Sequence, residues 1–136
     1  MSNNFKKKIV LVDDHPVMRK GLALIFDSDP GYEVIAQLDR GEELIQRLDE
    51  LNPDLIIIDI SLPGMNGLEL VKHVISQKED QKILVVSRHD ESLYAERVIR
   101  AGAKGYVMKL EAGDELLKAV RKVLGGGIYV SDEVSE

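Results

Sequence analysis

Polar side chains that can bind a metal ion and a phosphoryl group stand directly after short apolar runs in this sequence. The runs that begin at Ile9, Leu55, Ile83 and Tyr106 end, in that order, at the pair Asp13 and Asp14, at Asp59, at Ser87 and at Lys109. Mg²⁺ takes oxygen ligands and commonly binds through one or two carboxylates together with phosphate oxygens and water. A carboxylate can also attack a phosphoryl group and form an acyl phosphate. The set therefore predicts magnesium-assisted phosphoryl transfer, in which a hydroxyl and an ammonium group bind the phosphoryl oxygens.

Each of these residues, taken alone, has an ordinary structural explanation. An Asp after a strand is often a turn former, and Asp14, which precedes His15 and Pro16, could be only a helix cap. A Ser in such a position has the same explanation, and a Lys at a strand end is most often a solvated surface residue. The repetition favours a shared site, because polar groups end four apolar runs of one predicted sheet.

The elements that would position these groups alternate between strands and helices. Short runs rich in β-branched residues indicate strands buried on both faces, which is typical of a parallel sheet. Strands are predicted at about 8–13, 32–38, 55–58, 82–87 and 105–109, and helices at about 16–27, 42–51, 68–76, 91–101 and 114–124. Gly102 is expected to end the fourth helix.

Helical spacing also groups apolar residues on helix faces. In the first helix, one face is predicted to hold Val17, Gly21, Leu24 and Ile25. In the last helix, the residues predicted to point inward are Leu116, Leu117, Val120 and Val123.

Five successive β-α units predict a doubly wound α/β fold, in which right-handed connections give a three-layer α/β/α sandwich. Of the two strand orders common in such sheets, the central runs favour 2-1-3-4-5, the flavodoxin-like order. Ligands of these folds bind at the carboxyl ends of the strands, at the switch point between the first and third strands. Asp13, Asp14 and Asp59 are therefore expected at the mouth of a five-stranded parallel sheet.

Length and composition fit one acidic domain. The chain has 136 residues and a formal net charge of −6, which argues against direct nucleic-acid binding by this segment. Cysteine is absent, so a disulfide framework and a thiolate metal site are excluded. No apolar stretch approaches membrane-spanning length, and we expect a cytoplasmic location without a membrane partner.

Several segments resemble the receiver domain of two-component response regulators, specifically of the NarL/FixJ (LuxR-type) subfamily. The matching segments are 12–16, 59–67, 87–90 and 104–109, and residues 126–131 resemble that subfamily's exit from the last helix. The resemblance covers the chain from about Lys8 and implies the CheY-like form of the predicted fold. It implies an N-terminal leader at 1–7, a receiver domain at 8–125 and the start of a linker at 126–136.

The resemblance implies roles for the residues of the acidic site. Asp59 would be the phosphoacceptor, and the donor would be a phosphohistidine on a sensor histidine kinase or a small phosphodonor. Asp14 and Asp59 would bind Mg²⁺ through side-chain oxygens and Ser61 through its backbone carbonyl. Asp13 would act through metal-bound water, and Lys109 would pair with the phosphoryl oxygens.

The same resemblance implies a switch and an output. Ser87 would move toward the phosphoryl group and Tyr106 would turn inward behind it. This motion would couple the acceptor to the surface formed by 91–101, 105–109 and 114–124. The protein would be a signalling phosphoacceptor that catalyses only its own phosphorylation and dephosphorylation.

The implied partners follow from the subfamily. Phosphorylation could drive formation of a homodimer, and DNA would be bound only by a C-terminal helix-turn-helix domain outside this chain. A stand-alone receiver is the alternative.

The sequence departs from the family pattern at one peptide bond. Many receivers have a cis proline directly after the lysine of the last strand, whereas Leu110 follows Lys109 here. A cis bond before a non-proline residue is costly.

Ser61 and His89 occupy positions that tune the lifetime of the acyl phosphate in this family. His15 and His89 lack the spacing of zinc ligands, so no zinc site is predicted.

Three other functions fit the sequence less well. Small aspartate-nucleophile phosphatases carry two aspartates two residues apart on the first strand, whereas Asp13 and Asp14 are adjacent. A flavodoxin-like nucleotide or flavin module would need a phosphate-binding loop where this chain has an acidic segment. A receiver that is never phosphorylated would not need the full set of acids, hydroxyl and lysine.

Overall fold

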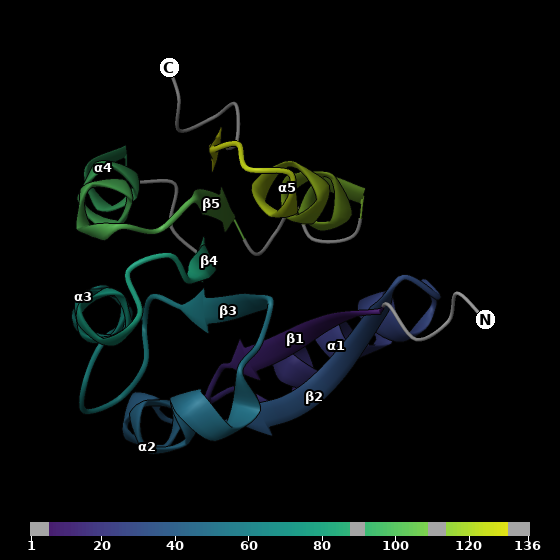
Figure 1. Cartoon of the computed structure of the whole chain (residues 1–136), viewed down its shortest axis with the longest axis horizontal. Coiled ribbons are helices and arrows are strands. Elements are labelled where there is room, and N and C mark those ends of the chain that lie inside the picture. Colours follow the sequence, from purple (N-terminus) through teal and green to yellow (C-terminus); the bar gives the residue numbers. More distant parts are fainter. Residues whose placement is uncertain (1–5, 88–91, 109–113, 131–136) are drawn as a thin grey trace.

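The computed structural model describes residues 6–87, 92–108 and 114–130, which form one central sheet with helices on both faces (Figure 1). The strands are β1 (Lys7–Val12), β2 (Tyr32–Leu38), β3 (Leu55–Asp59), β4 (Lys82–Ser87), β5 (Gly105–Met108) and β6 (Tyr129–Val130). The helices are α1 (Pro16–Asp27), α2 (Gly41–Leu51), α3 (Gly67–Gln77), α4 (Ser92–Ala101) and α5 (Asp114–Leu124). Every predicted element is present, and its described ends lie within one residue of the prediction.

The sheet is parallel throughout, with the order β2-β1-β3-β4-β5-β6. The predicted order 2-1-3-4-5 is confirmed, but the predicted count of five strands was wrong because β6 pairs with β5. After α5 the chain reverses at Gly126, whose φ of 99° favours glycine, and Val130 then lies in register with Tyr106. A two-residue strand is too short to produce a periodic apolar pattern, so the sequence did not indicate it.

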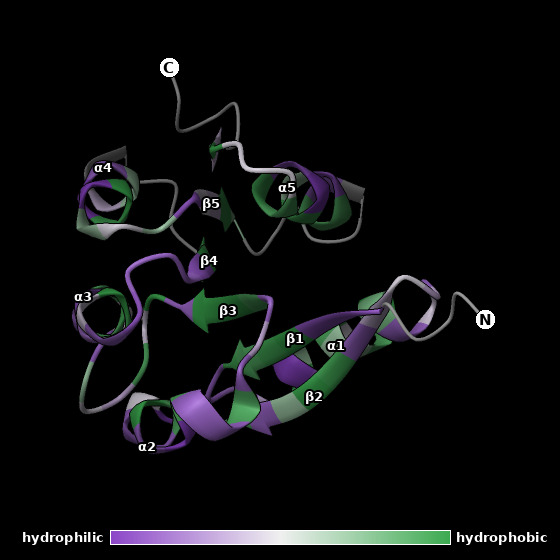
Figure 2. Cartoon of the chain, viewed as in Figure 1, coloured by the Kyte–Doolittle hydropathy of each residue, from purple (hydrophilic) through white to green (hydrophobic). Residues whose placement is uncertain are grey.

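The central strands are buried on both faces, as the continuous apolar runs predicted. Along β1, Val10 and Val12 pack into a cluster shared with α2, α3 and α4, whereas Ile9 and Leu11 pack into a second cluster shared with α1 and α5. Alternate residues of a strand point to opposite faces of the sheet, which explains the division. The apolar colouring of β1 and β3 in Figure 2 follows these buried runs.

The buried face of α1 differs from the predicted one. Val17 and Leu24 are 86% and 68% exposed, whereas Leu22, Ala23 and Phe26 are buried. This helix carries apolar residues on more than one face, so spacing alone selected the wrong set. The predicted grouping of Val17 with Leu24 is therefore corrected, because these side chains face solvent and not the sheet.

Predictions for two other helices hold more closely. In α5, Leu116, Val120 and Val123 are buried, and Leu117 is partly buried. Gly102 follows the end of α4 with a φ of 120°, as expected for a glycine that ends a helix. None of the described helices is both long and apolar enough to cross a membrane.

The loop from β3 into α3, residues 60–66, brings Gly67 into close contact with the backbone of Ile60. The Gly67 amide donates to the Ile60 carbonyl at 3.0 Å, and a Cβ atom at Gly67 would lie 2.6 Å from the Ile60 Cα. The side chain of Asn66 accepts a hydrogen bond from the Glu69 amide at 3.0 Å, and the Glu69 side chain accepts from the Asn66 amide at 3.4 Å. This reciprocal capping fixes the start of α3 close against the residue that ends β3.

Gly67→Ala is expected to destabilise the fold by about 1–3 kcal/mol, because the added methyl group meets backbone atoms that cannot yield cheaply. Gly21→Ala is the matched control, since a Cβ atom there meets nothing within 4 Å. Within a helix this substitution should stabilise the protein by about 0.5–1 kcal/mol. Urea unfolding measures both changes, and an unfolding free energy unchanged by Gly67→Ala would contradict the close approach.

Candidate functional site

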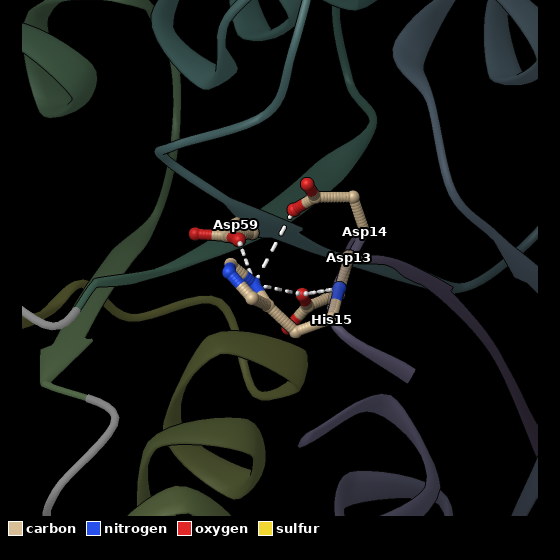
Figure 3. A group of neighbouring side chains, drawn as sticks. All are labelled: Asp13, Asp14, His15 and Asp59. Carbon is tan, nitrogen blue, oxygen red and sulfur yellow. Dashed lines mark hydrogen bonds and ion pairs between the residues drawn. The ribbon is translucent and has the colours of Figure 1, made fainter. Parts of the chain in front are cut away.

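The parallel pairing of β1 with β3 places the aspartates of these two strands side by side. Val12 lies in register with Ile58, so the residues that follow them, Asp13 and Asp59, meet at the carboxyl edge of the sheet. Both side chains are almost completely buried, with residue exposures of 1%. Asp14 lies beside them and is partly exposed. Figure 3 shows these carboxylates pointing toward one another.

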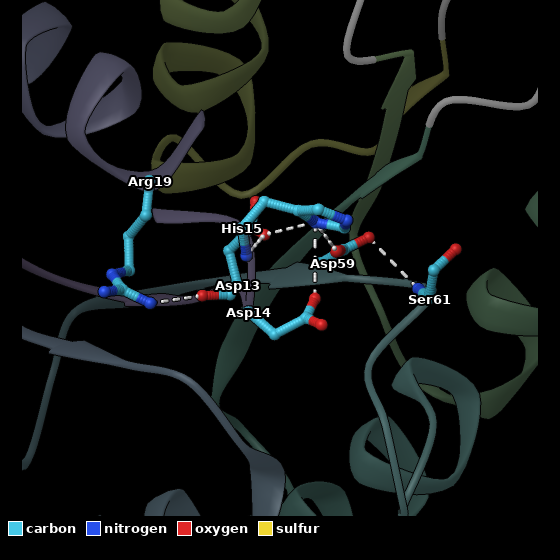
Figure 4. Close-up of polar contacts among 6 residues, drawn as sticks. All are labelled: Asp13, Asp14, His15, Arg19, Asp59 and Ser61. Carbon is cyan, nitrogen blue, oxygen red and sulfur yellow. Dashed lines mark hydrogen bonds and ion pairs between the residues drawn. The ribbon is translucent and has the colours of Figure 1, made fainter. Parts of the chain in front are cut away.

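Backbone groups and one arginine hold the carboxylates in place (Figure 4). The His15 amide donates to Asp13 Oδ1 at 2.9 Å, and the Ser61 amide donates to Asp59 Oδ1 at 3.0 Å. A guanidinium nitrogen of Arg19 donates to the Asp13 carbonyl at 2.7 Å. The carboxylates of Asp13 and Asp59 are therefore each held by a backbone amide two residues further along the chain.

The imidazole of His15 lies among the three carboxylates. Its Nδ1 is 3.1 Å from Asp13 Oδ1, 3.3 Å from Asp14 Oδ1 and 3.4 Å from Asp59 Oδ2. One ligand atom from each of these four residues lies within 4.8 Å of the others, which is the spacing of a possible metal site. The sequence therefore predicted three members of the cluster, whereas His15 was excluded as a metal ligand because it lacks the spacing of zinc ligands.

Carboxylates at this separation repel one another unless a cation lies between them. Their oxygens are the hard ligands that Mg²⁺ prefers, and a small number of protein carboxylates is typical of magnesium sites that also bind phosphate. The donor set of this edge therefore fits Mg²⁺.

Two further predicted residues lie on the neighbouring strands. Asp59 is in register with Val86, so Ser87 is the next residue along the same edge, where it is buried at the end of β4. Tyr106 is buried on β5 and lies in register with Val85. The structure thus brings the three aspartates together, with Ser87 on the adjacent strand and Tyr106 one strand further along the sheet.

Three residues of the sequence-based predictions lie outside the described residues. They are Lys109, which follows the last described residue of β5, its neighbour Leu110, and His89.

Sequence reasoning also missed Arg19. It lies on α1 one turn beyond His15, whose carbonyl accepts a hydrogen bond from the Arg19 amide at 2.9 Å. An arginine on an amphipathic helix carries no signal that it points back to the preceding strand, so only the fold reveals its contact with Asp13.

The fold and the acidic cluster together define a doubly wound domain built around a buried aspartate at the carboxyl edge of its sheet. The family model for the response regulator receiver domain matches residues 9–121, and the chain belongs to this family. Its role is that of a phosphoacceptor in two-component signalling.

Curated relatives support the NarL/FixJ-type assignment. The chain is 38% identical over 133 residues to the transcriptional regulatory protein DegU of Brevibacillus brevis, covering 98% of this chain and 56% of that protein. It is 34% identical over 137 residues to the nitrate/nitrite response regulator protein NarL of Escherichia coli K12, covering 99% of this chain and 62% of that protein. The chain thus spans only about three-fifths of the length of these relatives.

A solved structure agrees with the architecture. A two-component response regulator of the LuxR family from Aurantimonas sp. SI85-9A1 superposes with a TM-score of 0.92 at 33% identity, covering 96% of this chain and 93% of that one.

Arg19→Ala is expected to lower the unfolding free energy by about 1–3 kcal/mol, because it removes a charged donor from the Asp13 carbonyl. Lys20→Ala is the control, since Lys20 is the next residue of the same helix and its side chain is exposed. Chemical denaturation of the two variants measures the difference. Equal stabilities would show that the Arg19 hydrogen bond does not help to hold the end of β1.

Proposed function

We propose that Asp59 accepts the phosphoryl group in this receiver domain and that the donor is the phosphohistidine of a sensor histidine kinase. The observation that carries the proposal is the position of Asp59. Its carboxylate is buried at the end of a central strand, and Oδ1 accepts the Ser61 amide while Oδ2 lies 3.4 Å from His15 Nδ1 in the acidic cluster. Among the clustered carboxylates only Asp59 belongs to β3, whereas the other two follow β1.

Mg²⁺ would be held by side-chain oxygens of Asp14 and Asp59 and by the backbone carbonyl of Ser61, with Asp13 acting through a bound water. When bound, the ion neutralises charge on the phosphoryl oxygens and on the crowded acids. The residues of this chain supply position: Asp13 and Asp59 are fixed by backbone hydrogen bonds and do not need to reorganise.

In the transfer step, a carboxylate oxygen of Asp59 attacks the phosphorus of the donor. The new O–P bond forms as the P–N bond to the donor histidine breaks, and the imidazole leaves with that electron pair and takes up a proton from solvent. Attack of water on the acyl phosphate later returns Asp59 to its free carboxylate. The domain would therefore catalyse only its own phosphorylation and dephosphorylation.

Lys109 would bind phosphoryl oxygens from the side opposite the acids. Ser87, buried at the same edge, would move toward the phosphoryl group, and Tyr106 would turn inward behind it. This is a two-state equilibrium that the phosphoryl group biases through contacts made in one state only. The surface of α4, β5 and α5 would report the change.

The output is proposed to lie outside this chain. The curated relatives are longer than the segment matched here, and their names describe regulators of transcription. We propose a C-terminal helix-turn-helix domain that binds DNA, a homodimer formed on phosphorylation, and a cytoplasmic location. A stand-alone receiver remains the alternative arrangement.

Asp59→Asn is expected to abolish phosphorylation, because an amide cannot attack phosphorus and form the acyl phosphate. Intact-protein mass before and after acetyl phosphate with magnesium measures the gain of one phosphoryl group. Wild-type protein should gain it only with magnesium, and the variant should gain none.

Asp54→Asn is the matched control for this experiment. Asp54 directly precedes β3 at the opposite end of the strand and accepts the Lys8 amide at 2.7 Å, so its substitution should leave the phosphoryl gain intact. Incorporation into Asp59→Asn at the wild-type level would remove Asp59 as the acceptor. If wild-type protein ignores acetyl phosphate, the same comparison is run with its cognate kinase.

Lys109→Ala is expected to be phosphorylated at least about tenfold more slowly, because the phosphoryl oxygens lose a cationic partner in the transition state. The same mass assay, followed over time, measures the rate. Lys104→Ala is the control, since Lys104 is exposed just before β5. A rate equal to that of the control would exclude Lys109 from the mechanism.

A further inference from the structure

His15 occupies the N-cap position of α1 without serving as a cap. Its backbone is extended, with φ of −98° and ψ of 104°, and its side chain makes no hydrogen bond to the helix that follows. N-cap positions usually hold Ser, Thr, Asp or Asn, whose side chains bind the free amides of the first turn. Here the side chain points instead to the acidic cluster, where it is 39% exposed (Figure 3).

The distances from the ring nitrogen match those between neighbouring ligands of one metal ion. With metal–ligand bonds of about 2.1 Å, adjacent ligand atoms lie about 3.0 Å apart in an octahedral site and about 3.4 Å apart in a tetrahedral one. His15 Nδ1 lies at 3.1, 3.3 and 3.4 Å from oxygens of Asp13, Asp14 and Asp59. These are also hydrogen-bond and ion-pair distances, and Nδ1 shares a 3.1 Å hydrogen bond with Asp13 Oδ1. Binding of an ion would replace these contacts with a bond from Nδ1 to the metal, beside the ligand oxygens of Asp14 and Asp59.

An imidazole nitrogen changes which ion such a site prefers. Carboxylate, carbonyl and water oxygens suit Mg²⁺ and Mn²⁺, whereas imidazole suits later first-row ions, whose affinity rises from Mn²⁺ to Ni²⁺ and Cu²⁺. Imidazole binds a metal through the lone pair of a ring nitrogen, and Nδ1 is the ring nitrogen that lies closest to the carboxylates.

We propose that His15 is a ligand of the cation held by the aspartates and that it shifts the ion preference of the site from Mg²⁺ toward Ni²⁺ and related ions. The proposal rests on the proposed function only in assigning a cation to these carboxylates. It adds a specificity-determining residue that a three-acid magnesium site does not contain.

The test compares Ni²⁺ and Mg²⁺ binding to the whole chain by titration calorimetry. In wild-type protein Mg²⁺ should displace Ni²⁺, which shows that both ions use one site. His15→Gln should weaken Ni²⁺ binding at least about tenfold and Mg²⁺ binding less, because only Ni²⁺ gains strongly from the nitrogen. The ratio of the Mg²⁺ to the Ni²⁺ dissociation constant should therefore fall.

His73→Gln is the matched control. His73 is exposed on α3, and its substitution should leave both dissociation constants unchanged. Ni²⁺ binding that Mg²⁺ does not displace would overturn the proposal. The proposal would also fail if His15→Gln weakened the binding of both ions equally or weakened neither. Tighter binding of both ions would overturn it as well, because that result would show that the ring obstructs the cation.

Failure of the proposed function is recognised separately. The proposed function is tested by the mass gain at Asp59, and that assay needs no Ni²⁺. Suppose that wild-type protein gains no phosphoryl group from acetyl phosphate or from its cognate kinase, while His15→Gln still lowers the ratio of the dissociation constants. That result would remove the phosphoacceptor assignment and leave His15 as a metal ligand.

Discussion

The parallel contact between β1 and β3 is the constraint on which the site depends. It sets two nearly buried carboxylates against each other at the end of adjacent strands, with a third beside them. Like charges so close are unfavourable, and the fold opposes this cost with directed dipoles and cations rather than with distance. The His15 and Ser61 amides donate to Asp13 and Asp59, and an Arg19 guanidinium nitrogen donates to the Asp13 carbonyl. Carboxylate oxygens gathered in this way suit a hard divalent cation, and a bound cation would in turn attract the oxygens of a phosphoryl group.

The surrounding fold keeps this arrangement rigid. Both faces of the central strands are covered by separate apolar clusters, so the strand ends cannot move apart without disturbing one of them. The loop after Asp59 closes with the Gly67 backbone packed against Asp59 and Ile60, which fixes the start of α3 beside the end of β3. A site built on such strand ends is positioned before any ligand arrives, which is the condition for catalysis by charge placement.

The sequence predicted most of this because the relevant signals are local. Apolar runs bounded by polar residues indicated strands, and the places where they end indicated which side chains meet. Burial of α1 could not be predicted in the same way, since Val17 and Leu24 have the correct spacing but face solvent. The position of the His15 ring depends on a side-chain rotamer within an assembled pocket, and β6 depends on a partner strand supplied by β5. These features arise from tertiary contacts that one segment does not encode.

The pairing of β6 with β5 determines where the chain leaves the sheet after Val130. Val130 lies beside Tyr106 at the separation of paired strands, about 4.8 Å, and both side chains pack in the same apolar cluster. The Tyr129 amide also donates to the Lys104 carbonyl at 2.9 Å, so the departing chain is tethered to the start of β5. A displacement of the Tyr106 ring would therefore change the packing around Val130, where the chain leaves the sheet. The chain thus leaves the described domain next to the buried tyrosine of the sheet, and the geometry of its exit depends on that ring.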